Sequence, residues 1–375
     1  MRLSLAELRR AKLRFGLLTG AVALLVFLIL FQQTLASALL GSFIGGLEHQ
    51  SATVLAYNAD ARRSIDASRV TLGTVSQVVA VDGVAEAGPI GEATFTVEAG
   101  GERRDTTVFG YTLNGPGEPT TLVQGRLPAA DGEAVASSVD ADKGYGIGRT
   151  VTVVPGDTPL RIVGLAKDAQ FNVQPTLYVS FATYAAMTKA ANPAARAVLP
   201  NVVGVEPSSG VEPAALAERI TKDVAGVEAL DVATAVSSQP GAGSIRQSFA
   251  IILVLAFIVV ALVTGLFFLI LTVQKQQSLT LLRAVGASTP YLVGSLAVQV
   301  VLVMAAGIVI ASGLLAITTS GSGTGLEVSV SPRLILLTGS GVLILALTAS
   351  LAAVRRVVRI EPAAATARMA GGGLA

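Results

Sequence analysis

Side chains that could bind a metal or carry out nucleophilic catalysis are scarce in this sequence. The chain contains one histidine, His49, and no cysteine. A multi-histidine metal centre and thiolate chemistry are therefore excluded, as is a Ser-His-Asp triad away from His49. Glu48 precedes this histidine, so Glu48 and His49 form the one place where a carboxylate and an imidazole stand side by side. The residue types give no signature of an enzyme.

Two short motifs have ordinary interpretations as turns. The glycine-rich run Gly144–Gly148 precedes a predicted strand at Thr150–Val154, whereas a dinucleotide-binding loop follows a strand and opens a helix. We therefore predict a β-turn there. Asp140 and Asp142 lie in the same turn-rich segment and are interpreted as solvated turn residues rather than an acid/base pair. No Walker A lysine motif is present.

Charge is strongly segregated along the chain. Charged residues make up 14% of the sequence, and 52% of it is hydrophobic. Four runs carry no charge at all: Phe15–Leu47, Gln247–Gln274, Ala284–Leu326 and Leu334–Val354. Each run exceeds the ~20 residues that a helix needs to cross a bilayer. The pattern predicts four transmembrane helices, with a large polar segment between the first two.

The basic residues predict which way the chain crosses the membrane. They flank one side of the predicted helices, at Arg2, Arg9, Arg10, Lys12, Arg14, Lys275, Arg283, Arg355, Arg356, Arg359 and Arg368. The other side has Arg333 in its short loop and the acidic segment 48–246. By the positive-inside rule, both termini lie in the cytoplasm and residues 48–246 lie outside. The first apolar run is too long for the core of a signal peptide, so we expect an uncleaved helix in a multi-pass cell-membrane protein.

The resulting organisation has eight segments. They are the N-terminus with helix 1 (1–47), an extracytoplasmic stalk and domain (48–246), helix 2 (247–274), a cytoplasmic segment (275–288), helix 3 (289–317), an outer loop (318–333), helix 4 (334–354) and a cytoplasmic tail (355–375).

The first helix is expected to extend beyond the bilayer. A continuous helix from Leu17 to Tyr57 would be about 60 Å long, twice the hydrocarbon thickness. Small polar residues interrupt its second half, at Gln32, Gln33, Thr34, Ser37 and Ser42. Two interpretations stay open for them: they form ordinary helix–helix contacts, or they line a polar groove.

The segment between the first two helices is predicted to be an α+β domain. Short β segments are expected at Val78–Ala80, Thr94–Val97, Asp105–Phe109, Thr150–Val154, Leu160–Val163 and Thr176–Val179. Helices are expected at Phe181–Ala191 and Pro213–Val224, and residues 237–244 read as a linker. The fold class is therefore an α-helical membrane protein with four transmembrane helices and an inserted α+β extracytoplasmic domain.

Two motifs resemble those of the FtsX/MacB-type ABC transporter permeases. The segment Gln277–Ser288, with the sequence QSLTLLRAVGAS, is similar to the family's cytoplasmic coupling segment between helices 2 and 3. The segment Val354–Ala363 is similar to the family's ending, a basic helix terminus followed by Pro-Ala. The resemblance implies that the coupling segment docks onto a cytoplasmic ATPase. The residues expected to do so are Leu279, Leu281, Leu282, Arg283 and Gly286.

The resemblance also implies partners and excludes an intrinsic catalytic role. ATP and Mg would be bound by a separate ABC ATPase subunit, and the chain itself would need no cofactor. A single copy with four spans would form a transport path by pairing, so a permease homodimer in membrane lipid is expected. No basic stripe points to nucleic acid.

Within this family, the overall plan of the chain is similar to that of the haem-exporting permeases. Haem as transported substrate would need an apolar slot, an axial ligand and cations for its propionates. Phe31 and Phe43 could supply the walls (with Phe27 as a third aromatic), and Glu48 or His49 the axial ligand. Tyr57 and Arg246 complete the hypothetical site. Each of these residues also has an interpretation without haem. Glu48 and His49 would be solvated stalk residues, the phenylalanines would contact other helices or lipid, and Arg246 would be an anchor at the membrane boundary.

Two other functions stay open at this point. An exporter of lipid, peptide, antibiotic or lipoprotein would use the same machinery with different groove chemistry. An FtsX-like mechanotransmission protein would instead use ATP hydrolysis to move the outer domain and regulate a cell-wall hydrolase. The sequence does not decide among these functions.

Overall fold

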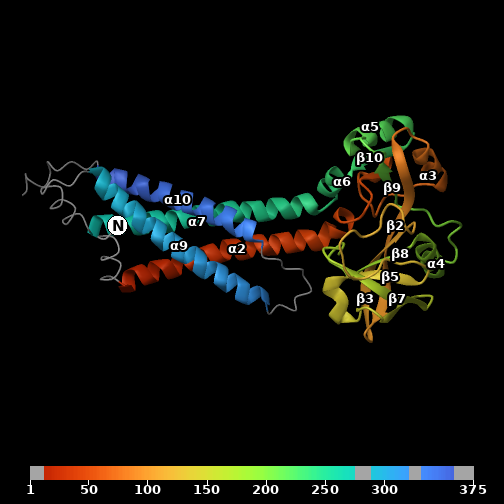
Figure 1. Cartoon of the computed structure of the whole chain (residues 1–375), viewed down its shortest axis with the longest axis horizontal. Helices are drawn as coiled ribbons and strands as arrows, with labels where there is room; N and C mark the ends of the chain where they lie inside the picture. The colour runs from red at the N-terminus through yellow and green to blue at the C-terminus, as the bar shows by residue number, and fades with distance from the viewer. Residues whose placement is uncertain (1–11, 275–288, 321–330, 359–375) are drawn as a thin grey trace, which may run out of the picture. The chain divides into compact units, whose positions relative to one another are not determined.

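The computed structural model describes residues 12–274, 289–320 and 331–358. It divides into a membrane unit, which contains residues up to Leu35 and from Ser248 onward, and an α+β unit, residues 36–247. Helices α2 and α7 contribute residues to both units, and each unit is described by itself below (Figure 1). The predicted coupling residues at 279, 281, 282, 283 and 286 lie outside the described residues.

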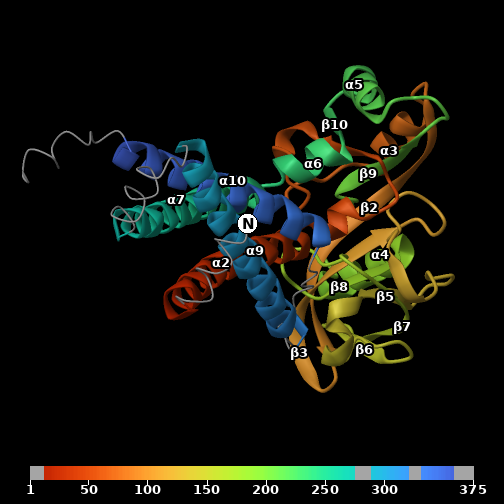
Figure 2. The ribbon, with the colours of Figure 1, turned by 60° about the vertical axis from the view of Figure 1, so that its left-hand side comes forward.

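The membrane unit is built from four long apolar helices. They are α2 (Lys12–Glu48), α7 (Ala242–Gln274), α9 (Thr289–Ser320) and α10 (Pro332–Val358) (Figure 2). All four are long and apolar enough to span a membrane, which confirms the predicted fold class for the described residues.

Side chains four residues apart hold this unit together. Leu18, Val22 and Val26 form a buried stripe on α2 and belong to one cluster with residues of α9 and α10. A Cβ atom at Gly307 of α9 would lie 2.7 Å from Val22 Cγ1, so glycine is needed where these two helices cross. Close backbone approach at a small residue is the usual packing mode of membrane helices.

The α+β unit contains one ten-stranded, mostly antiparallel sheet. Its strand order is β10-β1-β9-β2-β3-β8-β5-β7-β4, and β6 pairs with β2 and β7. The strands are β1 (Val54–Asn58), β2 (Val84–Ala99), β3 (Glu102–Tyr111), β4 (Leu122–Gly125), β5 (Glu133–Ser137), β6 (Thr150–Val154), β7 (Thr158–Ala166), β8 (Thr176–Ser180), β9 (Val202–Pro207) and β10 (Val227–Asp231). The long strand β2 pairs with β9 through its first half and with β3 through its second, so it joins the two halves of the sheet.

Short helices cover this sheet on its two halves. They are α3 (Leu72–Val79), α4 (Phe181–Ala191), α5 (Pro213–Asp223) and α6 (Val232–Ser238), with 3-10 turns at Ala59–Ala61 and Ser138–Lys143. Helices α3 and α5 pack on the β1–β9–β10 half, and α4 packs on β2 and β3. The ring of Tyr184 on α4 lies over Gly91 and Gly110, which face each other across β2 and β3; a Cβ atom at either glycine would overlap this tyrosine.

Three local expectations were wrong. Val78–Ala80 is the end of helix α3 and its cap, because Thr71 caps the helix and Val78 turns into the core with helical spacing. The supposed linker 237–244 is mostly helical: α6 ends at Ser238, α7 begins at Ala242, and a short break that includes Gly241, with a φ of 93°, separates them. The first helix ends at Glu48 rather than continuing to Tyr57.

Candidate functional site at the end of the first membrane helix

The last turns of α2 are fixed to the α+β unit by main-chain hydrogen bonds. The Gly46 N–H donates to Gln170 O at 2.7 Å. In the opposite sense, Asn172 N–H donates to Phe43 O at 3.1 Å and Val173 N–H donates to Ser42 O at 2.9 Å. We call this arrangement the clasp: residues 42–46 of α2 and the loop 168–173. Main-chain hydrogen bonds in both directions therefore hold the end of the helix against this loop.

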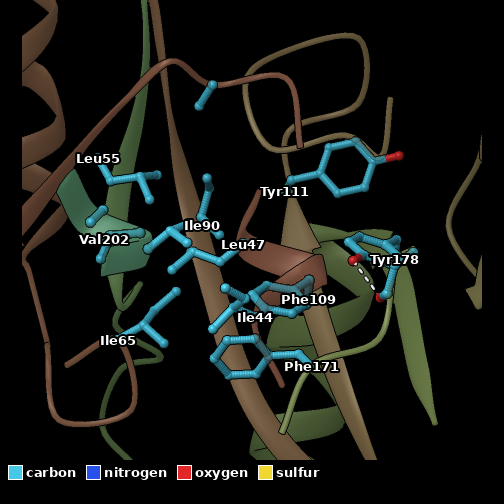
Figure 3. Packing of buried hydrophobic residues seen from close by; sticks show 14 of the residues in the cluster. Ile44, Leu47, Leu55, Ile65, Ile90, Phe109, Tyr111, Phe171, Tyr178 and Val202 are labelled. Atoms are coloured by element: carbon cyan, nitrogen blue, oxygen red, sulfur yellow. Dashed lines mark hydrogen bonds between the residues drawn. The ribbon is translucent and has the colours of Figure 1, made fainter. Parts of the chain in front are cut away.

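Apolar packing completes the clasp. Ile44 and Leu47 project from α2 into the main core of the unit, where Figure 3 shows them beside Phe109, Phe171 and Tyr178. Ile44 is 3% exposed and Leu47 is 1% exposed. Burying two such side chains fully is worth about 3–6 kcal/mol. The helix end is therefore part of the domain core rather than an attachment on its surface.

Two consecutive glycines make this close approach possible. A Cβ atom at Gly45 would overlap Asp168 O and lie 3.3 Å from Gln170 O, both of which are backbone atoms. A Cβ atom at Gly46 would lie 2.8 Å from Tyr178 Oη. That hydroxyl donates to Ala169 O at 2.8 Å, so it also holds the loop. Any larger residue at Gly45 must push the loop away from the helix.

The loop itself is held in a costly backbone conformation. Asp168, Asn172 and Val173 have φ values of 51°, 52° and 58°, in the left-handed region that residues other than glycine rarely adopt. The β-branched Val173 is the least suited to it. Such residues cost about 1–3 kcal/mol each and persist only where surrounding contacts enforce them. Here, the hydrogen bonds from Asn172 and Val173 to α2 supply that enforcement.

A buried carboxylate, that of Asp140, also holds the loop 168–173 in place. Gln170 Nε2 donates to Asp140 Oδ2 at 2.8 Å, and Lys143 Nζ lies 2.7 Å from Asp140 Oδ1. Asp140 is fully buried. The expectation that it is a solvated turn residue was wrong, because the turn Ser138–Lys143 directs this side chain inward to bind Gln170. Asp142, its neighbour in the turn, is exposed.

A second segment fixes the residues that follow α2. His49 O accepts hydrogen bonds from the Thr120 N–H at 2.9 Å and from Thr120 Oγ1 at 3.0 Å. The Ser51 N–H donates to Glu118 O at 2.9 Å. Residues 42–51 are thus held on two sides, by the clasp loop and by residues 118–120.

Of the proposed haem-contacting residues, Tyr57 is excluded from an open site. It lies in β1, has no exposed surface and belongs to the domain core. Burial raises the pKa of its phenol far above the usual value. A continuous helix would have placed it on a stalk, but the chain leaves the helix at Glu48 and enters the sheet at Val54.

The other haem-contacting candidates are distributed over both units. Glu48 is exposed at the end of α2, and His49 is half-buried with Nδ1 3.3 Å from Gly45 O. Arg246 is exposed on α7, and Phe43 packs against the core at Gly241. Phe31 belongs to the membrane unit, where its ring stacks on Phe27 at a centroid distance of 5.8 Å. In the described part of the chain, no hydrogen bond or ion pair joins Glu48 to Arg246.

The polar residues of α2 take part in helix packing. Thr338 Oγ1 of α10 donates to Gln33 Oε1 at 2.7 Å, and Gln32 Nε2 donates to Phe249 O of α7 at 3.1 Å. Thr34 Oγ1 donates to Leu30 O of its own helix. For Gln32, Gln33 and Thr34, these contacts agree with the first of the two open interpretations, since each of the three side chains bonds to a neighbouring helix or to its own turn.

Sequence reasoning missed the clasp. The Gly45-Gly46 pair inside an apolar helical run is the one signal that could have indicated a close backbone contact. Nothing in residues 168–173 marks them as its partner.

The geometry defines a class: a multi-pass membrane protein with four apolar helices and an α+β domain inserted between the first and second. Residues 250–362 match the family described as FtsX-like permease C-terminal. The chain is 27% identical to "Uncharacterized ABC transporter permease Rv0072" of Mycobacterium tuberculosis, over 78% of this chain and 77% of that protein. It is 20% identical to "Putative hemin transport system permease protein HrtB" of Staphylococcus haemolyticus, over 96% of this chain and 98% of that protein.

Two solved structures are similar at low scores. One is the periplasmic region of MacB from Actinobacillus actinomycetemcomitans, with a TM-score of 0.36 and 14% identity over 51% of this chain and 92% of that one. The other is the extracellular domain of the ABC-type transporter YknZ from Gram-positive bacteria, with a TM-score of 0.34 and 15% identity over 48% of this chain and 100% of that one. The C-terminal match and the permease relatives support an ABC transporter permease of the FtsX type.

Proposed function

We propose that this chain is the permease subunit of an ABC-type efflux pump that expels an amphipathic molecule from the membrane, with haem as the first candidate. ATP is hydrolysed by a separate cytoplasmic subunit. The observation that supports coupled movement is the clasp, in which α2 and the domain share a core and three main-chain hydrogen bonds. The charge bias supports an outer domain and cytoplasmic termini.

The clasp supports a mechanical role for α2. This helix is continuous from Lys12 to Glu48, and its last turns move only together with the loop 168–173 and the core residues around Ile44 and Leu47. A displacement of α2 driven by the ATPase would therefore carry the domain with it. Packed elements transmit such displacements as rigid bodies.

The proposed energy input enters through the segment 275–288. Leu281, Leu282 and Arg283 would help to dock the ATPase, and the amphipathic segment would lie at the membrane surface. Replacing both leucines with Asp should abolish stimulation of the ATPase by the permease while membrane insertion is retained. Co-purification of the ATPase with unchanged transport would show that the segment is only a connector.

Haem as the substrate is supported by the relative named as a hemin transport permease, with which the chain aligns over almost its whole length. The available donors are Glu48, exposed at the end of α2, and His49 beside it. A carboxylate is a hard oxygen donor that suits ferric iron and releases it readily, so Glu48 is the preferred ligand. Arg246 remains the candidate partner for a propionate, and Tyr57 is withdrawn because it is buried.

A hemin titration of the purified permease, followed by its Soret band, tests this assignment. Glu48→Ala should weaken hemin binding and shift the band, and His49→Ala should do so less. Glu98→Ala, which removes an exposed carboxylate from β2, serves as the control. An unaltered affinity and spectrum in the Glu48/His49 double variant would exclude this haem site but leave the permease assignment standing.

Mechanotransmission to a cell-wall hydrolase is the second candidate function. The clasp supports this function equally, because a helix end that is fixed to the domain would move the domain. The two functions differ in what stimulates ATP hydrolysis. A pump is stimulated by its amphipathic substrate. A mechanotransmitter responds to a protein bound at its outer domain and is indifferent to hemin or apolar drugs. The ATPase rate of the reconstituted complex with and without hemin separates them.

A further inference from the structure

The two membrane helices that enter the α+β unit are attached to it in different ways. Helix α2 ends inside the core, where the main-chain hydrogen bonds of the clasp fix it. Helix α7 begins after a short break, residues 239–241, that separates it from α6 (Figure 1). In the part of the chain that the structure describes, no main-chain hydrogen bond joins residues 239–247 to a strand or to the clasp. The attachment of α7 therefore lacks the bonds that hold α2.

Helix α6, which precedes the break, is anchored to the domain. The Val232 N–H donates to Thr53 O at 3.0 Å, at the start of this helix. Ala235 and Val236 are buried in the main core of the unit. Because α6 is held in this way, any freedom of α7 arises after the last residue of α6, Ser238.

The residues of the break suit a change of backbone direction. Pro240 has no N–H, so it cannot continue the hydrogen bonding of α6. Gly241 has a φ of 93°, a region that glycine enters without steric cost. The main-chain bonds across the break are local: the Ala242 N–H donates to Gln239 O and the Ile245 N–H to Gly241 O, both at 3.1 Å. Hinges are typically a few residues at the ends of elements that absorb changes in φ and ψ, and this break has that character.

Side-chain contacts hold the break only weakly to the domain. Gln239 Nε2 donates to Asp66 Oδ2 at 3.4 Å, which is long for a hydrogen bond. Ala242 is fully buried, but four of the next five residues are exposed. Residues 44–47 of α2, by contrast, are all buried. Segments with few buried apolar contacts open at a lower free energy than segments packed in a core, so α7 is the easier of the two helices to move.

The ring of Phe43, on the fixed helix α2, is the surface that the break touches. A Cβ atom at Gly241 would lie 3.0 Å from Phe43 Cζ and 3.5 Å from Phe43 Cε1. The main chain of Phe43 is held by the clasp, because its carbonyl accepts the Asn172 N–H. Contact between the ring and the glycine is of the van der Waals kind and has no fixed direction. The ring therefore limits how closely the break approaches α2 without preventing rotation.

We propose that residues 239–241 form a hinge about which α7 turns against the ring of Phe43, while α2 and the domain move as one body. The consequence for transport rests on the proposed function. A displacement of α2 would carry the domain with it, and α7 would follow separately, so the spacing of the two helices at the domain would change during the cycle.

Spin labels on the full-length permease in lipid nanodiscs measure the two attachments separately. The chain has no cysteine, so labelled pairs can be introduced directly. Lys222→Cys with Gln247→Cys (the α7 pair) reports α7 against the domain, and Lys222→Cys with Ser37→Cys (the α2 pair) reports α2; all three positions are exposed. Gln247 lies about 9 Å beyond Gly241 along the helix, so a swing of about 20° moves it by about 3 Å.

Double electron–electron resonance should therefore give a distance distribution about 3 Å wider for the α7 pair than for the α2 pair. A distribution for the α7 pair that is no wider than that for the α2 pair would overturn the hinge.

Gly241→Ala tests the hinge residue itself. The added Cβ atom would press on the Phe43 ring, and alanine rarely adopts a φ of 93°. The mean distance of the α7 pair should therefore shift, while that of the α2 pair stays the same. Gly243→Ala is the matched control, since a Cβ atom there meets nothing within 4 Å, and it should shift neither pair. An α7 pair that Gly241→Ala leaves unchanged would contradict the hinge.

Phe43→Ala covers the case in which Gly241→Ala fails to fold. This variant keeps the main-chain carbonyl that the clasp uses and removes only the ring. It should broaden the distribution of the α7 pair and leave the α2 pair unchanged. Equal broadening of both pairs would show that the ring belongs to the clasp and would overturn its role in the hinge.

These distances are measured without substrate or ATP. If they behave as expected in a permease that neither binds hemin nor stimulates an ATPase, the hinge stands and the proposed function is wrong. If hemin binds while the two pairs have equal widths, the hinge is wrong and the proposed function stands.

Discussion

The substitution Gly45→Ala tests whether the clasp, rather than ordinary helix packing, holds the end of α2 to the domain. The added methyl group would overlap Asp168 O and crowd Gln170 O, which are backbone atoms of a loop already in a strained conformation. The loop must therefore retreat, which breaks the three main-chain bonds made by Gly46, Phe43 and Ser42. At about 1 kcal/mol each, these are worth about 3 kcal/mol. The better helix propensity of alanine offsets about 1 kcal/mol of this loss, so the free energy of unfolding should fall by about 2 kcal/mol.

Gly41 offers a matched control on the same helix. A Cβ atom there meets nothing within 4 Å, so Gly41→Ala should gain helix propensity and stabilise by up to about 1 kcal/mol. For a folding unit of this size, a 2 kcal/mol loss lowers the Tm by about 4–8 °C. Because the chain contains no tryptophan, unfolding in detergent is best followed by calorimetry or far-ultraviolet circular dichroism. Equal or greater stability of Gly45→Ala than of Gly41→Ala would refute the clasp.

Three further outcomes are expected. A cysteine at the exposed Ser209 should react with an impermeant maleimide from outside intact cells, whereas one at Ser278 should react only after permeabilisation; outside labelling of both would reject the topology. A double-mutant cycle with Gln33→Leu and Thr338→Val should give a coupling energy of about 0.6–1.7 kcal/mol, and a value near zero would show that their hydrogen bond contributes nothing. Arg126 lowers the pKa of Glu133 to about 2, so the stabilisation present above pH 4.5 is lost as pH falls toward 2; in acid titrations Glu133→Gln should lack this loss.

The membrane spans could be predicted from sequence because their signal is local. A charge-free run of sufficient length has few other uses, and the four helices begin and end close to the charges that bound those runs. Helix α4 was likewise predicted at Phe181–Ala191, since Ser180 is a good N-cap and the helical residues follow without interruption.

The sheet was harder to predict because its order is not local. Strand β1 is far along the chain from β9 and β10 yet lies between them in the sheet. The apolar residues of β1 and β9 are buried on both faces, so the alternating pattern that marks a half-exposed strand is absent from these two strands. At Val78–Ala80 a strand was predicted because β-branched residues stand next to a turn. These residues instead end helix α3, whose apolar residues have helical spacing.

Some residues of the candidate site could also be predicted from the sequence, and others could not. Glu48 and His49 were found because donor types are visible in sequence, and the structure leaves Glu48 exposed at the helix end. Tyr57 was misassigned because its position depended on where the helix ends. Asp140 was misassigned because a turn residue is normally solvated, and only the fold shows that it holds Gln170.

The clasp makes little sense in a domain that only needs to be stable. Left-handed backbone at Asn172 and Val173 is costly and persists only where surrounding contacts enforce it. That cost falls where the last turns of α2 meet the loop 168–173, and the hydrogen bonds to Phe43 O and Ser42 O are the contacts that enforce it. The proposed function requires the domain to follow α2, and a rigid joint at this point is what would transmit that movement.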